Sequence, residues 1–139
     1  MIGLDTDILA RFYVDDPGDP EAAKQRPIAR RIIAESTALF VPLTVILELE
    51  WILRAFYGFD RSDFIRVAEH LSALPNVTIE NEPRIAWALS RHAEGLDFAD
   101  ALHWAACGHR EGFFTFDDRR FGWRAARSWW VPEVSVPAE

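Results

Sequence analysis

The chain has 139 residues, half of them hydrophobic, and a formal net charge of −7, so it is long and apolar enough to fold as one domain and is not disordered. Its single cysteine, Cys107, excludes an intrachain disulfide and a zinc site made of thiolates, and no apolar run approaches the roughly 20 residues of a membrane helix. The N-terminus has no basic region ahead of an apolar stretch, so we expect no signal peptide and a cytoplasmic protein with a single domain over residues 1–139.

The first half of the chain is predicted to alternate short apolar strands with helices. In chain order the expected elements are a strand at 2–4, a helix at 6–14, a loop at 15–20, a helix from 20 to about 35, a strand at 39–41, and helices at 43–57 and 60–74. Asp19 followed by Pro20 is a typical helix start, whereas Pro27 is expected to kink or restart that helix. In the last of these helices the amphipathic pattern turns four residues inward: Phe64, Val67, Ala68 and Leu71.

The second half continues the alternation. Its expected elements are a strand at 77–79, helices at 82–93 and 97–109, a strand at 113–116 and a short last strand within 129–136. Strands separated by helices need crossover connections, which favour a parallel sheet. We therefore predict an α/β protein with three α/β/α layers and a mostly parallel central sheet of four to five strands. Ligands of such sheets gather at the carboxyl ends of the strands.

The acidic balance of the chain is unfavourable for nucleic-acid binding, because phosphates attract cations. An acidic protein with no nucleic-acid role is therefore one interpretation of the charge. The basic residues are nevertheless clustered in two groups. The first comprises Lys24, Arg26, Arg30 and Arg31, and the second comprises Arg119, Arg120, Arg124 and Arg127.

Two aspartates come directly after predicted strands, where a site is expected. Asp5 follows the first strand, and Asp117 follows the strand that starts at Phe113. Each has a structural alternative, since Asp5 could cap the next helix and Asp117 could serve an Asp-rich turn with Asp118. Because Thr6 can cap the helix instead, we expect Asp5 to be free to point into a site.

The helix predicted at 43–57 is apolar nearly all round and contains two acids. Glu50 has Arg54 one turn further on, which predicts an exposed ion pair. Glu48 has no basic residue at that spacing, and an unpaired carboxylate on a buried apolar surface is costly. Glu48 could instead reach solvent at the edge of the helix, but neutralisation by a metal explains it better.

Asp97 and Asp100 lie at the start of the helix predicted at 97–109. Asp97 is well placed as the N-cap, and Asp100 lies in the first turn, where an acid is also favoured by the helix dipole. A first-turn position also projects toward a site at the strand ends, so both interpretations remain open for Asp100.

The order of these acids along the chain is more specific than any one of them. One follows the first strand, one lies in an apolar helix, one opens a helix and one follows the last core strand. In this order the chain resembles the PIN-domain nucleases, and in particular the VapC toxins. The resemblance spans almost the whole chain and rests on four segments: Gly3-Leu4-Asp5-Thr6, Pro42 to Leu49 with Glu48, Asp97 to Ala106 with Asp100, and Phe114-Thr115-Phe116-Asp117.

This resemblance implies a metal-dependent endoribonuclease that cuts RNA, works as a homodimer and is held in check by a VapB-like antitoxin. It implies Mg²⁺ or Mn²⁺ as cofactor, with four residues as ligands and catalytic groups: Asp5, Glu48, Asp100 and Asp117. Thr6 and Thr115 match supporting polar positions, with Asp118 as a further candidate, and Asp97 is an additional acid that could replace Asp100. Hard oxygen ligands suit these cations, and a metal that activates water makes a protein nucleophile unnecessary.

Two other enzyme or signalling classes place acids after strands. Asp5-Thr6-Asp7 is similar to the start of a haloacid-dehalogenase-like phosphatase, and a response-regulator receiver also clusters acids at strand ends. Both families use a lysine late in the sheet, whereas the one lysine here, Lys24, lies far too early. A non-catalytic binding module with the PIN fold is the remaining alternative, and the presence of all four acids argues against it.

Overall fold

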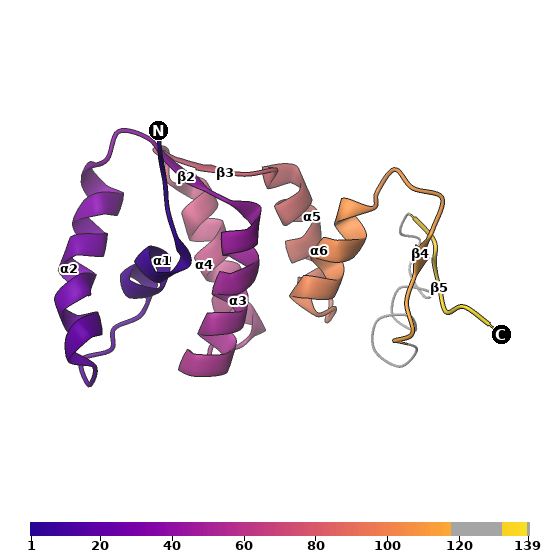
Figure 1. Cartoon of the computed structure of the whole chain (residues 1–139), viewed down its shortest axis with the longest axis horizontal. Coiled ribbons are helices and arrows are strands. Elements are labelled where there is room, and N and C mark those ends of the chain that lie inside the picture. The colour runs from indigo at the N-terminus through magenta and orange to yellow at the C-terminus, as the bar shows by residue number, and fades with distance from the viewer. Residues whose placement is uncertain (118–131, 139) are drawn as a thin grey trace. The chain divides into compact units, whose positions relative to one another are not determined.

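The computed structural model describes residues 1–117 and 132–138, and the chain divides into two compact units, Met1–Glu82 and Pro83–Glu139 (Figure 1). Predictions for Asp118, for the second basic group and for the last strand before residue 132 fall outside the described residues. Among the described residues, no helix has both the length and the apolar character needed to span a membrane.

The first unit is a parallel three-stranded sheet whose strands are joined by pairs of helices. Its elements are β1 (Ile2–Gly3), α1 (Thr6–Tyr13), α2 (Pro20–Glu35), β2 (Leu39–Val41), α3 (Leu43–Tyr57), α4 (Arg61–Ala73) and β3 (Val77–Ile79). The strand order is β1-β2-β3, with Ile2 opposite Leu39 and Leu39 opposite Val77. The predicted order of elements in this half is confirmed, with boundaries that differ by one residue or less in most of them.

Helix α2 begins where the sequence predicts it. Asp19 is its N-cap and accepts hydrogen bonds from the backbone N–H groups of Glu21 and Ala22, with Pro20 in the first turn. Pro27 lies inside α2, which continues to Glu35, so the predicted restart does not occur. The proline is exposed, and the helix is continuous around it although one backbone donor is missing.

The core of the first unit is built from one stripe of each helix against the sheet. The inward residues predicted for α4 are all buried, which confirms that pattern. In α3 the buried stripe follows helical spacing through Ile46, Leu49 and Leu53, whereas Trp51 and Phe56 are 50% and 68% exposed. The sequence of α3 is apolar nearly all round, which favours burial, but only one side of the helix is buried.

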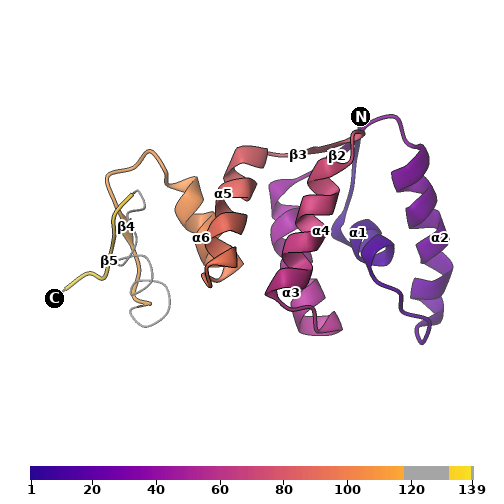
Figure 2. The same ribbon diagram turned by 180° about the vertical axis from the view of Figure 1, so that it is seen from behind.

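The described part of the second unit contains two helices and two short strands. These are α5 (Glu82–Ala93), α6 (Phe98–Ala106), β4 (Phe113–Phe114) and β5 (Val134–Ser135), and β4 pairs with β5 in parallel (Figure 2). Trp104 of α6 is fully buried, meets Trp87 edge to face at 5.4 Å between ring centroids, and donates from Nε1 to the carbonyl of Pro132. Both α6 and β4 end earlier than predicted, at Ala106 and Phe114.

The α/β class with parallel strands is confirmed. All five described strands pair in parallel, but they form a three-stranded and a two-stranded sheet rather than the single sheet that the sequence pattern suggested. The short strand β4 has only two ladder residues, and within the described residues its partner is β5.

Candidate active site

One buried threonine joins two of the predicted site residues. Asp5 is the N-cap of α1, and its Oδ1 accepts a hydrogen bond of 2.8 Å from the backbone N–H of Thr6. The hydroxyl of Thr6 donates to Oε1 of Glu48 in α3. Thr6 is only 2% exposed, so its side chain is fixed by the surrounding core. The carboxylates of Asp5 and Glu48 are thus bonded to two atoms of the same residue.

The prediction that Thr6 caps the helix and leaves Asp5 free was wrong. Asp5 has the extended backbone of an N-cap (φ −83°, ψ 166°), whereas Thr6 is already the first helical residue. Its hydroxyl therefore turns away from capping and bonds a distant helix. Asp5 is exposed to solvent, so the carboxylate remains accessible although one of its oxygens caps the helix.

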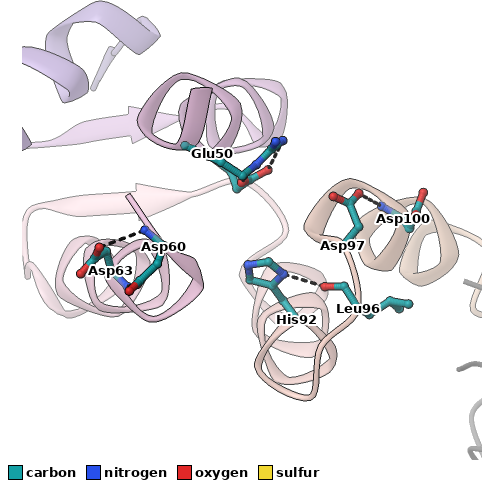
Figure 3. A network of polar contacts seen from close by, with 8 residues as sticks. Glu50, Asp60, Asp63, His92, Leu96, Asp97 and Asp100 are labelled. Carbon is teal, nitrogen blue, oxygen red and sulfur yellow. Dashed lines mark hydrogen bonds and ion pairs between the residues drawn. The ribbon is translucent and has the colours of Figure 1, made fainter. Parts of the chain in front are cut away.

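The two acids of α3 also differ from the prediction. Glu50 is the buried one, at 4% exposure, and Glu48 is exposed. The ion pair between Glu50 and Arg54 is confirmed, with 2.8 Å between Arg54 Nε and Glu50 Oε2, but its carboxylate is enclosed rather than solvated (Figure 3). Burial of that charge is tolerated because Arg54 pairs with it.

A sequence signal for this burial exists. Glu50 lies four residues after Ile46 and three before Leu53, on the buried stripe of α3. Glu48 lies beside that stripe, next to Thr6, and its partner is a hydroxyl rather than a cation. The lack of a basic neighbour, which was the sequence argument for Glu48, is therefore not what places Glu48 at the candidate site.

In the second unit, Asp97 caps α6, as predicted. Its Oδ2 accepts a hydrogen bond of 3.1 Å from the backbone N–H of Asp100 (Figure 3). Asp97 is exposed and Asp100 is half-buried in the first turn. The cap uses the carboxylate of Asp97 and only the backbone of Asp100, so the carboxylate of Asp100 is not needed to start the helix.

The segment after β4 is held by another threonine. The backbone N–H of Asp117 donates to Oγ1 of Thr115 at 3.0 Å, which fixes the turn that leads into Asp117. Thr115 and Asp117 are both half-buried. In both units a predicted supporting threonine therefore bonds a predicted acidic residue, through the side chain of Glu48 in one case and the backbone of Asp117 in the other.

The chemistry of these donors fits a hard divalent cation. The predicted site residues are all carboxylates, which are ligands that Mg²⁺ and Mn²⁺ prefer. Asp5 and Glu48 supply two of them from the first unit, and Asp100 and Asp117 belong to the second. Among residues 1–117 and 132–138, no group of three or more acidic, histidine or cysteine side chains is close enough to hold a metal. The described structure thus brings the acids together in the first unit as a pair.

Comparison with known proteins identifies the family of the chain. A family model described as PIN domain matches residues 2–126, a stretch that includes every predicted site residue. No protein with a curated description matches the chain. PIN domains are typically metal-dependent nucleases. The chain therefore belongs to the PIN domain family.

Proposed function

We propose that this PIN domain is an endoribonuclease that hydrolyses RNA phosphodiester bonds with Mg²⁺ or Mn²⁺, and that it is the toxin of a VapC-type toxin–antitoxin pair. The observation that supports the nuclease most directly is the bonding of Asp5 and Glu48 to Thr6. Both residues are exposed, so two carboxylates of the kind that Mg²⁺ and Mn²⁺ prefer are held beside the same residue and can be reached by a cation.

In this proposal Asp5, Glu48, Asp100 and Asp117 hold the metal, which when bound would orient water and stabilise the leaving oxygen. Thr6 is a positioning residue. Its hydroxyl donates a hydrogen bond to one oxygen of Glu48, so the rotamer of the Glu48 side chain is fixed before a cation binds. Asp97 shapes the start of α6 and thereby the position of Asp100.

The toxin role adds a protein partner, a VapB-like antitoxin, and a homodimer in the cytoplasm. Surface features support a partner: Trp51 and Phe56 are exposed on α3 and meet edge to face at 5.3 Å between ring centroids. Exposed aromatic pairs of this kind are common at protein interfaces. Two adjacent tryptophans of the sequence, Trp129 and Trp130, are further candidates for a partner contact and lie outside the described residues.

Cleavage of single-stranded RNA with Mg²⁺, with Mn²⁺ and with EDTA tests the nuclease. Asp5→Asn and Glu48→Gln should abolish cleavage, and Asp5→Asn is chosen because asparagine still caps α1. Glu69→Gln is the matched control, since Glu69 is an exposed acid on α4 outside the site. Full activity of either site variant, or undiminished cleavage in EDTA, would refute the assignment.

Expression in a bacterial host without the antitoxin tests the toxin role. Wild type should arrest growth, and Glu48→Gln, produced in equal soluble amounts, should not. Normal growth of cells that express a protein active as a nuclease in vitro would refute the toxin role and leave the nuclease assignment standing.

A further inference from the structure

Helix α1 is joined to α3 by side-chain hydrogen bonds at both of its ends. In its first turn, the hydroxyl of Thr6 donates to Glu48. In its last turn, Nη1 of Arg11 donates to the hydroxyl of Tyr57, the last residue of α3, at 3.1 Å. Either contact alone would let α1 pivot about it. The two come in the same order along both helices, so together they fix both ends of α1 on α3.

The guanidinium of Arg11 is itself held in place by α2. Its Nε donates to Oε1 of Gln25 at 2.9 Å, and the amide of Gln25 donates to Glu21 at 2.9 Å. Two donors of one rigid, planar group thus reach two different helices, which sets the direction of the bond to Tyr57. Arg11 and Tyr57 are both half-buried, so water competes less for these groups than it does on an open surface.

Packing leaves part of the contact between α1 and α2 unfilled. A cavity of about 140 Å³ lies between these helices, and Arg11 forms part of its wall. The cavity is lined by Asp7, Ile8, Arg11, Gln25, Ile28 and Ala29. Close packing normally fixes how one helix sits on another, so directional hydrogen bonds contribute more to the orientation of α1 where that packing is incomplete.

We propose that Arg11 and Tyr57 are positioning residues of the candidate site, whose bond holds α1 on α3 and so fixes the separation of Asp5 and Glu48. The inference rests on the proposed function and adds two residues to it. Asp5 is the N-cap of α1 and Glu48 lies in α3, so a shift of one helix along the other changes the distance between the two carboxylates. Neither positioning residue needs to touch the metal.

Removal of one hydroxyl tests the proposal through metal affinity. Tyr57→Phe keeps both the ring and the charge of Arg11, and we expect it to weaken Mn²⁺ binding to the full-length protein by about 3- to 10-fold in titration calorimetry. Tyr13→Phe is the matched control. The hydroxyl of Tyr13 bonds Nδ1 of His70 at 2.8 Å and so joins α1 to α4, which contains none of the predicted ligands. The control should bind Mn²⁺ as wild type does.

A double-mutant cycle in EDTA tests the same link without metal. Thr6→Val and Tyr57→Phe change side chains at opposite ends of α1, so independent effects would multiply in the unfolding equilibrium constant. If both bonds hold the same helix, the second change costs less once the first has been made. Relative to wild type, the equilibrium constant of the double variant should be smaller than the product of the two single ratios by about 3-fold or more in urea unfolding.

Three results would overturn the proposal. They are a Tyr57→Phe variant with the Mn²⁺ affinity of wild type, a Tyr13→Phe variant that is weakened equally, and single effects that simply multiply in the cycle. A wild-type protein that binds no Mn²⁺ would instead refute the proposed metal site. The cycle in EDTA would then decide alone whether Arg11 and Tyr57 position Thr6 against Glu48.

Discussion

The hydroxyl of Thr6 and the carboxylate of Glu48 are joined by a hydrogen bond across 42 residues of sequence. This contact ties the first turn of α1 to the middle of α3, and it is made by a buried side chain to an exposed one. The hydrogen bond uses one oxygen of an exposed carboxylate, so a ligand can reach Glu48 from solvent.

Removal of that hydroxyl should affect metal binding more than folding. Thr6→Val keeps the shape of the side chain but cannot donate, so Glu48 loses its fixed orientation. We expect metal affinity or cleavage to fall by about 10- to 100-fold, and the free energy of unfolding to fall by only about 1 kcal/mol. Titration with Mn²⁺ and urea unfolding measure the two effects. Thr44→Val, an exposed threonine of α3, is the control. A variant with unchanged metal affinity would show that the bond is structural only.

The stability that the start of α4 contributes should decrease at acid pH. Asp60 and Asp63 form a reciprocal capping box, and the backbone N–H of Asp63 holds the pKa of Asp60 below its usual range, with help from the hydroxyl of Ser62. Because the folded-state pKa is lowered, this contribution to stability is present at neutral pH and is lost as pH falls through the lowered pKa. Asp60→Asn, which can still cap, should match wild type at pH 7 in thermal melting and lose less stability than wild type on acidification. An equal loss of stability on acidification in wild type and variant would contradict this prediction.

Replacement of the proline inside α2 should stabilise the protein. Pro27 removes one backbone donor from a helix that continues past it, and the residue is exposed, so Pro27→Ala restores a hydrogen bond without creating a cavity. The proline also restricts the unfolded chain, which offsets part of the gain. We expect the free energy of unfolding to rise by about 1–2 kcal/mol. Arg31→Ala, an exposed change in the same helix, should stay within about 0.5 kcal/mol. A less stable Pro27→Ala variant would mean that the ring is needed for packing.

Melting experiments with EDTA and with excess Mg²⁺ or Mn²⁺ should distinguish the role of Asp97 from that of Asp100. Asp97→Ala loses the cap of α6 and should cost about 1 kcal/mol, with the metal-induced rise in melting temperature kept. Asp100→Asn should leave metal-free stability unchanged or raised, because a repelling charge is removed, and should lose much of the metal-induced rise. The reverse pattern would make Asp97 the ligand in place of Asp100.

Helix and strand positions of the first unit followed from local signals. Asp19-Pro20 marks a helix start through the chemistry of capping, and the spacing of Phe64, Val67 and Leu71 marks a buried face. These signals depend on neighbours within one or two turns, so the sequence contains them. Pairing of β4 with β5 depends instead on a partner about twenty residues away, and alternation alone does not specify which strand that is.

The choice of Asp5 and Glu48 as site residues stays a prediction, but the contacts expected for them were wrong. The pattern assigned capping to Thr6 and burial to the wrong acid of α3. The capping error arose because Asp5 and Thr6 are both good N-caps, and only the backbone angles decide between them. The burial error arose because the side of α3 that faces the core is set by tertiary packing, although the spacing from Ile46 to Glu50 indicated it.

The register of the first sheet has a consequence for synthesis on the ribosome. The central strand β2 needs both Ile2–Gly3 and Val77–Ile79 as partners, so its ladders are completed only after Ile79 has been made and has emerged. Asp5, Thr6 and Glu48 all precede Ile79 in the chain, whereas Asp100 and Asp117 follow it and emerge later. Thr6 can therefore bond Asp5 and Glu48 in the nascent chain before the other half of the acidic set has left the ribosome.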